Sequence, residues 1–187
     1  MKALLFFPLM IAAAMPLAAQ NRYFTRTGTV FFDAEGALDD VEEIKAQNSM
    51  ATCIYDAGTG DMEWMVLIKS FQFKNALMQD HFNENYLESS KFPKATFKGK
   101  LTNPAAVKLT QDGSYAVTVS GALTMHGITQ QISVPGTVKV SGGKPALSAD
   151  FAVALKDYGI KVPAVVGNKV AETVKIRISA ALEKFNS

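Results

Sequence analysis

Few side chains in this sequence could carry out catalysis or hold a metal ion. There are two histidines, His81 and His126, one cysteine, Cys53, and scattered carboxylates. Cys53 could form a nucleophilic pair with a histidine if the fold brought the two together. A zinc site built on both histidines would need at least one further ligand. A single cysteine also excludes a disulfide bond within the chain.

The short motifs of common active sites are absent as well. The sequence has no Gly-x-Ser-x-Gly elbow, no phosphate-binding loop and no His-Glu-x-x-His motif. We interpret Cys53 as a small packed hydrophobe and both histidines as structural or surface residues, with the lining of a cavity mouth as the second interpretation. The sequence therefore predicts no catalytic residue, no metal site and no cofactor, and a small-molecule hydrolase or isomerase is kept only as an alternative.

The composition excludes two further classes of protein. The net charge is +2, whereas a protein that binds nucleic acid by neutralising phosphates needs a clustered basic face. Hydrophobic residues make up 48% of the chain, which is too many for a disordered protein. We therefore expect no nucleic-acid partner, and the length suits one domain with a substantial core.

The first residues form a pattern that is typical of secretory signal peptides. Lys2 supplies a minimal positive start, residues 3–17 are apolar, and two alanines precede Gln20. The apolar run is shorter than the roughly 20 residues that a membrane-spanning helix needs. We therefore expect a signal peptide over residues 1–19 with cleavage after Ala19, a mature domain over residues 20–187, and a periplasmic or secreted location.

Apolar and polar residues alternate along most of the remaining chain, which indicates strands with one buried face. Short turns rich in Gly and Asp separate these segments, so we expect about eight antiparallel strands. Pro135-Gly136 predicts a bulge or bend, because proline cannot donate to a strand ladder. The strands are expected near residues 27–33, 49–55, 63–73, 95–101, 115–123, 128–140, 147–155 and 174–182.

One segment has the spacing of a helix instead. Asn75 can cap a helix over about residues 76–87, and Phe92-Pro93 would return the chain to a strand. The apolar residues at helical spacing are Leu77, Met78, Phe82 and Tyr86.

Eight antiparallel strands with one apolar face form either a sandwich or a closed barrel, and such a barrel is filled by side chains or holds one small ligand. Large inward residues could fill the interior, which would suit a structural or partner-binding envelope protein. Periodicity alone does not decide between an interior filled by side chains and one that holds a ligand. The small inward candidates that would leave space are Ala95, Gly99, Gly121, Ala149 and Ala180, and the large ones include Phe97, Tyr115 and Phe151.

Two stretches carry a family resemblance. In residues 70–99, Asp80-His81 is followed by an amphipathic stretch, by Phe92-Pro93 and by a strand that contains Phe97. Residues 121–129 read Gly-Ala-Leu-Thr-Met-His-Gly-Ile-Thr. Both resemble patterns of the YceI-like family of bacterial lipid- and polyisoprenoid-binding proteins, and with the signal peptide and the last strand the resemblance covers the mature chain. The residues after His81 depart from the family's usual His-Leu-x-Ser-x-x-Phe-Phe.

The resemblance implies an all-β, lipocalin-like antiparallel barrel of eight strands with one short α-helix near one end. It also implies an apolar interior that holds a long isoprenoid chain or a similar amphiphilic lipid, for carriage, storage or sequestration. Such a ligand would be compatible with transient contact with a membrane surface, and a homodimer is one oligomeric state open to the domain. The residues expected at the cavity wall or mouth are Trp64, Phe71, Phe73, Met78, His81, Phe82, Tyr86, Phe97, Tyr115 and Phe151.

Overall fold

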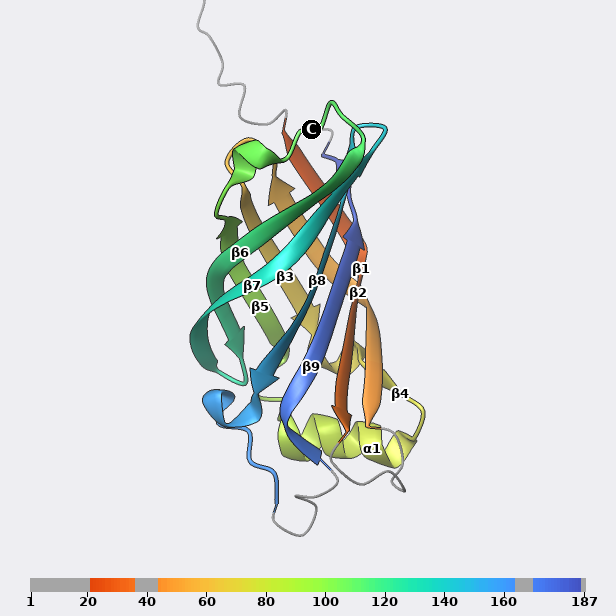
Figure 1. The fold of residues 1–187 in the computed structure, drawn as a ribbon. Helices are drawn as coiled ribbons and strands as arrows, with labels where there is room; N and C mark the ends of the chain where they lie inside the picture. The colour runs from red at the N-terminus through yellow and green to blue at the C-terminus, as the bar shows by residue number, and fades with distance from the viewer. Residues whose placement is uncertain (1–20, 36–43, 164–169, 186–187) are drawn as a thin grey trace, which may run out of the picture.

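The computed structural model describes residues 21–35, 44–163 and 170–185, so the predicted signal peptide lies outside the described residues. The long strands form one antiparallel sheet that closes on itself through pairing of the first strand with the second (Figure 1). The predicted all-β, eight-stranded barrel is confirmed. In spatial order its strands are β1 (Arg22–Glu35), β9 (Val170–Ala181), β8 (Lys144–Ala154), β7 (Ile128–Ser141), β6 (Gly113–Met125), β5 (Lys94–Leu101), β3 (Asp61–Leu67) and β2 (Lys45–Asp56).

Two very short strands extend this barrel. β4 (Gln72–Phe73) pairs with the start of β2, and β10 (Glu183–Lys184) pairs with the start of β1. They follow β3 and β9 in the chain after short interruptions, so each lengthens the barrel wall beside the strand before it. No described helix is long and apolar enough to cross a membrane.

The predicted helix lies across one end of the barrel, which we call the helix end (Figure 1). It consists of α1 (Ala76–His81) and a π-helical turn, η3 (Phe82–Tyr86). Asn75 caps it as expected, since its side-chain oxygen accepts hydrogen bonds from the backbone N–H groups of Leu77 and Met78. Leu77 differs from the amphipathic pattern and is 62% exposed. Consecutive helix residues point about 100° apart, so Leu77 leaves the face that carries Met78.

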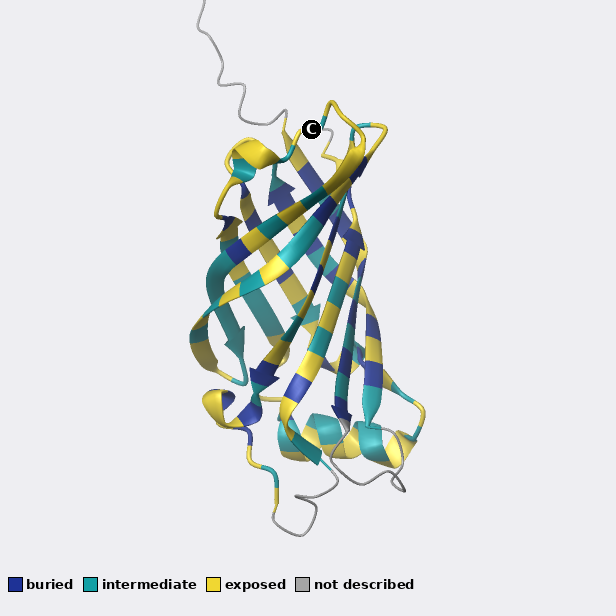
Figure 2. Ribbon diagram, viewed as in Figure 1, coloured by how far each residue is buried: buried dark blue, intermediate teal, exposed yellow. Residues whose placement is uncertain are grey.

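The opposite end, which we call the far end, is filled by side chains. Tyr55, Leu101, Val140 and Leu182 lie there, each at most 2% exposed, and all four belong to the hydrophobic core. Figure 2 shows the resulting alternation of buried and exposed positions along the strands. Tight packing of this kind closes the barrel at the far end.

Pro135-Gly136 does not interrupt its strand and forms no bulge against β6, unlike one of the two expected irregularities. β7 keeps an unshifted register with β6 from Met125 opposite Ile128 to Gly113 opposite Val140. The irregularity lies on the other side of β7, where the pairing with β8 ends at Thr137 opposite Ser148. The proline therefore marks the point where β7 separates from β8.

Candidate ligand-binding site

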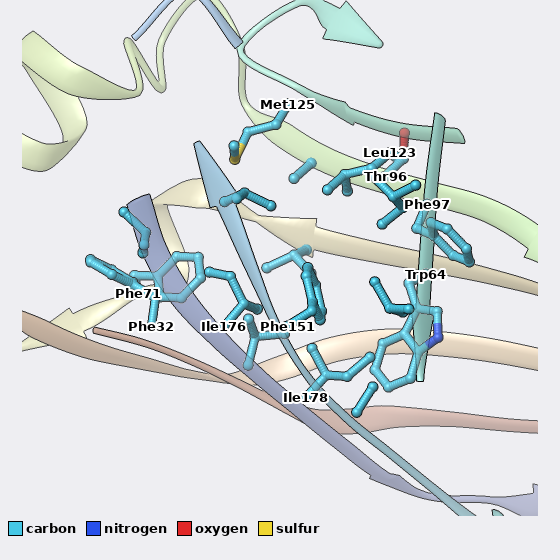
Figure 3. Close-up of a pocket in the computed structure, with 18 of the residues that line it drawn as sticks. Phe32, Trp64, Phe71, Thr96, Phe97, Leu123, Met125, Phe151, Ile176 and Ile178 are labelled. Carbon is cyan, nitrogen blue, oxygen red and sulfur yellow. The ribbon is translucent and has the colours of Figure 1, made fainter. Parts of the chain in front are cut away.

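An apolar cavity of about 380 Å³ occupies the barrel between its two ends. Its wall consists almost wholly of aliphatic and aromatic side chains (Figure 3). Within the described part of the chain, no Asp, Glu, Lys or Arg side chain lines it. The cavity therefore suits an apolar molecule and offers no charged partner to an ion.

Residues in the middle of the strands show that the interior is hollow. Ile176, Ile178 and Phe151 line the cavity, yet each keeps an intermediate exposure. Val174 and Ala180, on the same face of β9 nearer its two ends, are buried. A side chain that faces a core retains exposure only where space is left inside, so the side-chain-filled barrel is excluded.

All of the predicted cavity residues except Tyr115 line the cavity, although contact with a ligand stays a prediction. Trp64, Phe97 and Phe151 lie along the middle of the barrel (Figure 3). Those at the helix end are Phe71, Phe73, Met78, His81, Phe82 and Tyr86.

Tyr115 is the exception, and its placement at the cavity is wrong. It lies near the start of β6, towards the far end, where side chains fill the interior. Its hydroxyl hydrogen-bonds to the carbonyl oxygens of Lys108 at 3.2 Å and Gln111 at 2.8 Å. The Tyr115 side chain therefore holds the loop between β5 and β6 and does not line the cavity.

The prediction selected aromatic residues and so missed the aliphatic part of the wall. Alternation within each strand was the signal that could have found it, because inward positions recur at every second residue. Examples of the missed aliphatic residues are Leu123, Met125, Val134, Ile176 and Ile178, and the aromatic Phe32 was missed as well.

Only some of the expected small positions leave space. Ala95 and Ala149 line the cavity, whereas Ala180 is buried elsewhere in the core. Gly99 and Gly121 face each other across β5 and β6, and neither lines the cavity. A Cβ at Gly121 would overlap the backbone of β5, and one at Gly99 would overlap the Phe97 ring. These glycines therefore allow close approach of two strands.

A phenylalanine cluster lines the cavity at the helix end. The ring of Phe82, in η3, lies 5.3 Å from Phe32, 5.5 Å from Phe71 and 5.0 Å from Phe73, measured between ring centroids. Rings at these separations attract one another beyond the area they bury. The cluster thus holds the helix on the barrel and forms the floor of the cavity, with the exposed His81 at its rim.

His126 lies outside the cavity and ties three segments together. Its Nε2 is 2.7 Å from Glu88 Oε2 and its Nδ1 is 3.0 Å from the carbonyl oxygen of Tyr158, in η5 (Leu155–Tyr158). Glu88 and His126 have positive φ angles, 42° and 51°. His126 is therefore a structural tie at the helix end.

Cys53 is fully buried, and desolvation raises the pKa of its thiol far above the ordinary value. Because the thiolate is the nucleophilic form, this cysteine is a poor nucleophile. Among the described residues, no group of three or more His, Cys, Asp or Glu side chains is arranged to hold a metal ion.

Comparison with known proteins agrees with this geometry. A family model described as YceI-like domain matches residues 19–182. The chain belongs to this family. A search of curated proteins gave no match.

Solved structures share the fold of this YceI-like domain. A polyisoprenoid binding domain from Saccharophagus degradans, implicated in plant cell wall breakdown, has a TM-score of 0.74 at 14% identity, and the match covers 89% of this chain and 99% of that one. BcnA of Burkholderia cenocepacia has a TM-score of 0.65 at 16% identity, with 83% and 96% covered. The Campylobacter jejuni YCEI protein has a TM-score of 0.56 at 16% identity, with 78% and 88% covered.

Proposed function

We propose that this YceI-like domain is an extracytoplasmic binding protein that holds a long isoprenoid chain or a similar amphiphilic lipid in its barrel. The observation that carries the proposal is the apolar cavity of about 380 Å³ with no charged side chain among its described lining residues. A lipid ligand is also supported by the solved structure from Saccharophagus degradans, which is described as a polyisoprenoid binding domain. The extracytoplasmic location rests on the signal-peptide pattern of residues 1–19.

Burial of an apolar chain can supply the binding energy. Each buried CH₂ group contributes roughly 0.8 kcal/mol, so one five-carbon isoprene unit contributes about 3–4 kcal/mol. Micromolar affinity corresponds to about 8 kcal/mol. A few units are therefore sufficient even after part of the gain is lost in ordering a flexible chain.

Native mass spectrometry tests the proposal directly. We expect protein purified gently from the cell envelope fraction to carry a non-covalent lipid mass, and its N-terminus to be Gln20. The stripped protein should take up an isoprenoid quinone or a polyprenyl phosphate. A protein that is consistently empty and takes up neither compound would overturn the lipid-binding proposal, and an intact N-terminus in the cytoplasmic fraction would overturn the location.

A matched pair of variants on β8 connects binding with the cavity. Ala149 lines the cavity, whereas Ala152 is exposed on the outer face of the same strand. We expect Ala149→Phe to reduce lipid uptake at least tenfold by filling the lumen, and Ala152→Phe to leave uptake unchanged. Equal uptake by both variants would place the lipid outside the barrel.

A further inference from the structure

The barrel wall has an unpaired stretch between β7 and β8. The two strands pair from Ser141 opposite Lys144 to Thr137 opposite Ser148 and no further. Below that point β7 continues its pairing with β6 only, and β8 continues with β9 only. Figure 1 shows the two strands diverging towards the helix end. We call the region between residues 128–136 of β7 and residues 149–154 of β8 the β7–β8 slot.

The cavity lining includes both residues at the top of this slot. Thr137 and Ser148, the last paired residues, both line the cavity, although Ser148 is exposed on the outer face of β8. Val134 and Phe151 line the cavity from the two sides of the slot. A residue that belongs both to the outer face and to the cavity lining marks a place where the wall is thin or open.

The sequence at the top of the slot disfavours pairing of the two strands there. Pro135 has no N–H group to donate across the gap, and proline in a sheet is characteristic of an unpaired edge. The regular pairing of Pro135 with Thr118 of β6 directs the position of the missing donor towards β8. Gly136 and Ala149, at the top of the slot, carry little or no side chain that could cover it.

The lower end of the slot is held by side-chain contacts. Gln130 Nε2 donates to the carbonyl oxygen of Asp157 at 2.8 Å, and His126 Nδ1 lies 3.0 Å from the carbonyl oxygen of Tyr158. The first contact joins the start of β7 to η5, and the second joins the turn before β7 to η5. η5 follows β8 directly. The slot is therefore a bounded window, with a ladder pair above it and η5 below it.

Passage at either end of the barrel would have to displace packed side chains. The far end is packed, and at the helix end the phenylalanine cluster would have to separate Phe82 from three neighbouring rings. Passage through the slot breaks no ladder hydrogen bond between β7 and β8, since none is formed there.

We propose that the lipid chain enters and leaves the cavity sideways through the β7–β8 slot. This inference rests on the proposed lipid-binding function and assigns its route. The ligand class that such a window fits is a lipid with a single long chain, which can slide edgewise between two strands.

Cross-linking across the slot tests this route. Continuing the register of Thr137 opposite Ser148 places Ser133 opposite Ala152, and both are exposed. The test variant is S133C/A152C. The matched control is A152C/K175C, which joins positions already paired between β8 and β9. Where oxidation leaves free thiols, a bifunctional maleimide bridges the pair, and the buried Cys53 is protected from both reagents.

The probe is retinol, a fluorescent isoprenoid alcohol, and the measurement is its release rate after stopped-flow mixing with lipid vesicles. We expect cross-linking of S133C/A152C to slow release at least tenfold, reduction of its disulfide to restore the rate, and the cross-linked control to release retinol at the wild-type rate. Gln130→Ala, which removes one of the two contacts at the lower end of the slot, should speed release severalfold. An unchanged rate in the cross-linked slot variant would overturn the slot, while absence of retinol uptake by the wild-type protein would overturn the binding function itself.

Discussion

Tyr55 shows what the packed far end does to a single polar group. Its hydroxyl is buried and has no hydrogen-bond partner among the described residues. Desolvation, with smaller contributions from Asp56 and Tyr23, raises the pKa of Tyr55 to about 12 from an ordinary 10.0. The folded state therefore keeps this proton at pH values where the unfolded state has lost it.

The pH dependence of stability follows from that shift. Because the folded pKa is raised, the contribution of Tyr55 is complete below about pH 10 and is lost as pH rises from about 10 to 12. We expect urea unfolding to show a falling free energy over this range. Tyr55→Phe should remove part of the fall without loss of stability at pH 8, since it also removes an unpartnered hydroxyl. An identical fall in the variant would contradict the assignment.

Cys53 provides a second measurement at the scale of one residue. Because its thiol is fully buried and the thiolate is disfavoured, we expect no reaction with a disulfide reagent in the native protein at pH 8. Addition of urea should release one reactive thiol in parallel with the loss of near-ultraviolet circular dichroism. Rapid modification of the native protein would show that this part of the far end opens.

At the scale of elements, the cap of α1 is open to a direct test. Asn75 accepts hydrogen bonds from the backbone N–H groups of Leu77 and Met78, and no residue of α1 is fully buried. Asn75→Ala should destabilise the helix by about 1 kcal/mol. We expect faster hydrogen exchange at these two amides, with little change in the barrel strands. Asn75→Asp keeps the acceptor and serves as the control, so equal exchange in both variants would exclude a capping role.

The tie between His126 and Glu88 is a second element-scale feature. It joins the β6–β7 turn to the segment after η3 through a 2.7 Å contact, whereas Lys91 lies 3.8 Å from the same carboxylate. We expect Glu88→Ala to lower the free energy of unfolding by about 1–2 kcal/mol, since it leaves a nitrogen of the largely buried His126 ring without its partner. Lys91→Ala should change it by less than about 0.5 kcal/mol. Equal effects would mean that the tie is only a surface charge pair.

The sequence predicted the individual strands and the helix better than it predicted how neighbouring strands pair. Alternation determines which face of a strand is buried, so strands such as 174–182 followed from it, whereas the barrel followed from the family resemblance. The helix was predicted because Asn75 and the spacing of Met78 and Phe82 are local signals. Pro135-Gly136 was detected as an irregularity, but its effect falls on the pairing with β8, which depends on residues distant in the sequence. The close approach at Gly99 and Gly121 is likewise a property of two strands together.

At the scale of the whole molecule, the hollow interior links stability to occupancy. A ligand that binds only the folded state stabilises it by about 2.7 kcal/mol at a concentration one hundred times its Kd. For a domain of this size that corresponds to a rise in Tm of roughly 5–10 °C. We expect this rise when retinol is added to the wild-type protein in calorimetry. Ala149→Phe should show a much smaller rise, and an equal rise would mean that the stabilising site is not the cavity.

The only tryptophan of the sequence, Trp64, is part of the cavity wall and 6% exposed. The intrinsic emission of the unlabelled protein therefore originates at the place where a guest molecule would sit. The intensity and wavelength of this emission should therefore report whether the cavity is occupied, without an attached dye that could perturb the protein. Retinol absorbs at the wavelengths where indole emits, so energy transfer from Trp64 to retinol would measure the rate at which retinol enters the cavity.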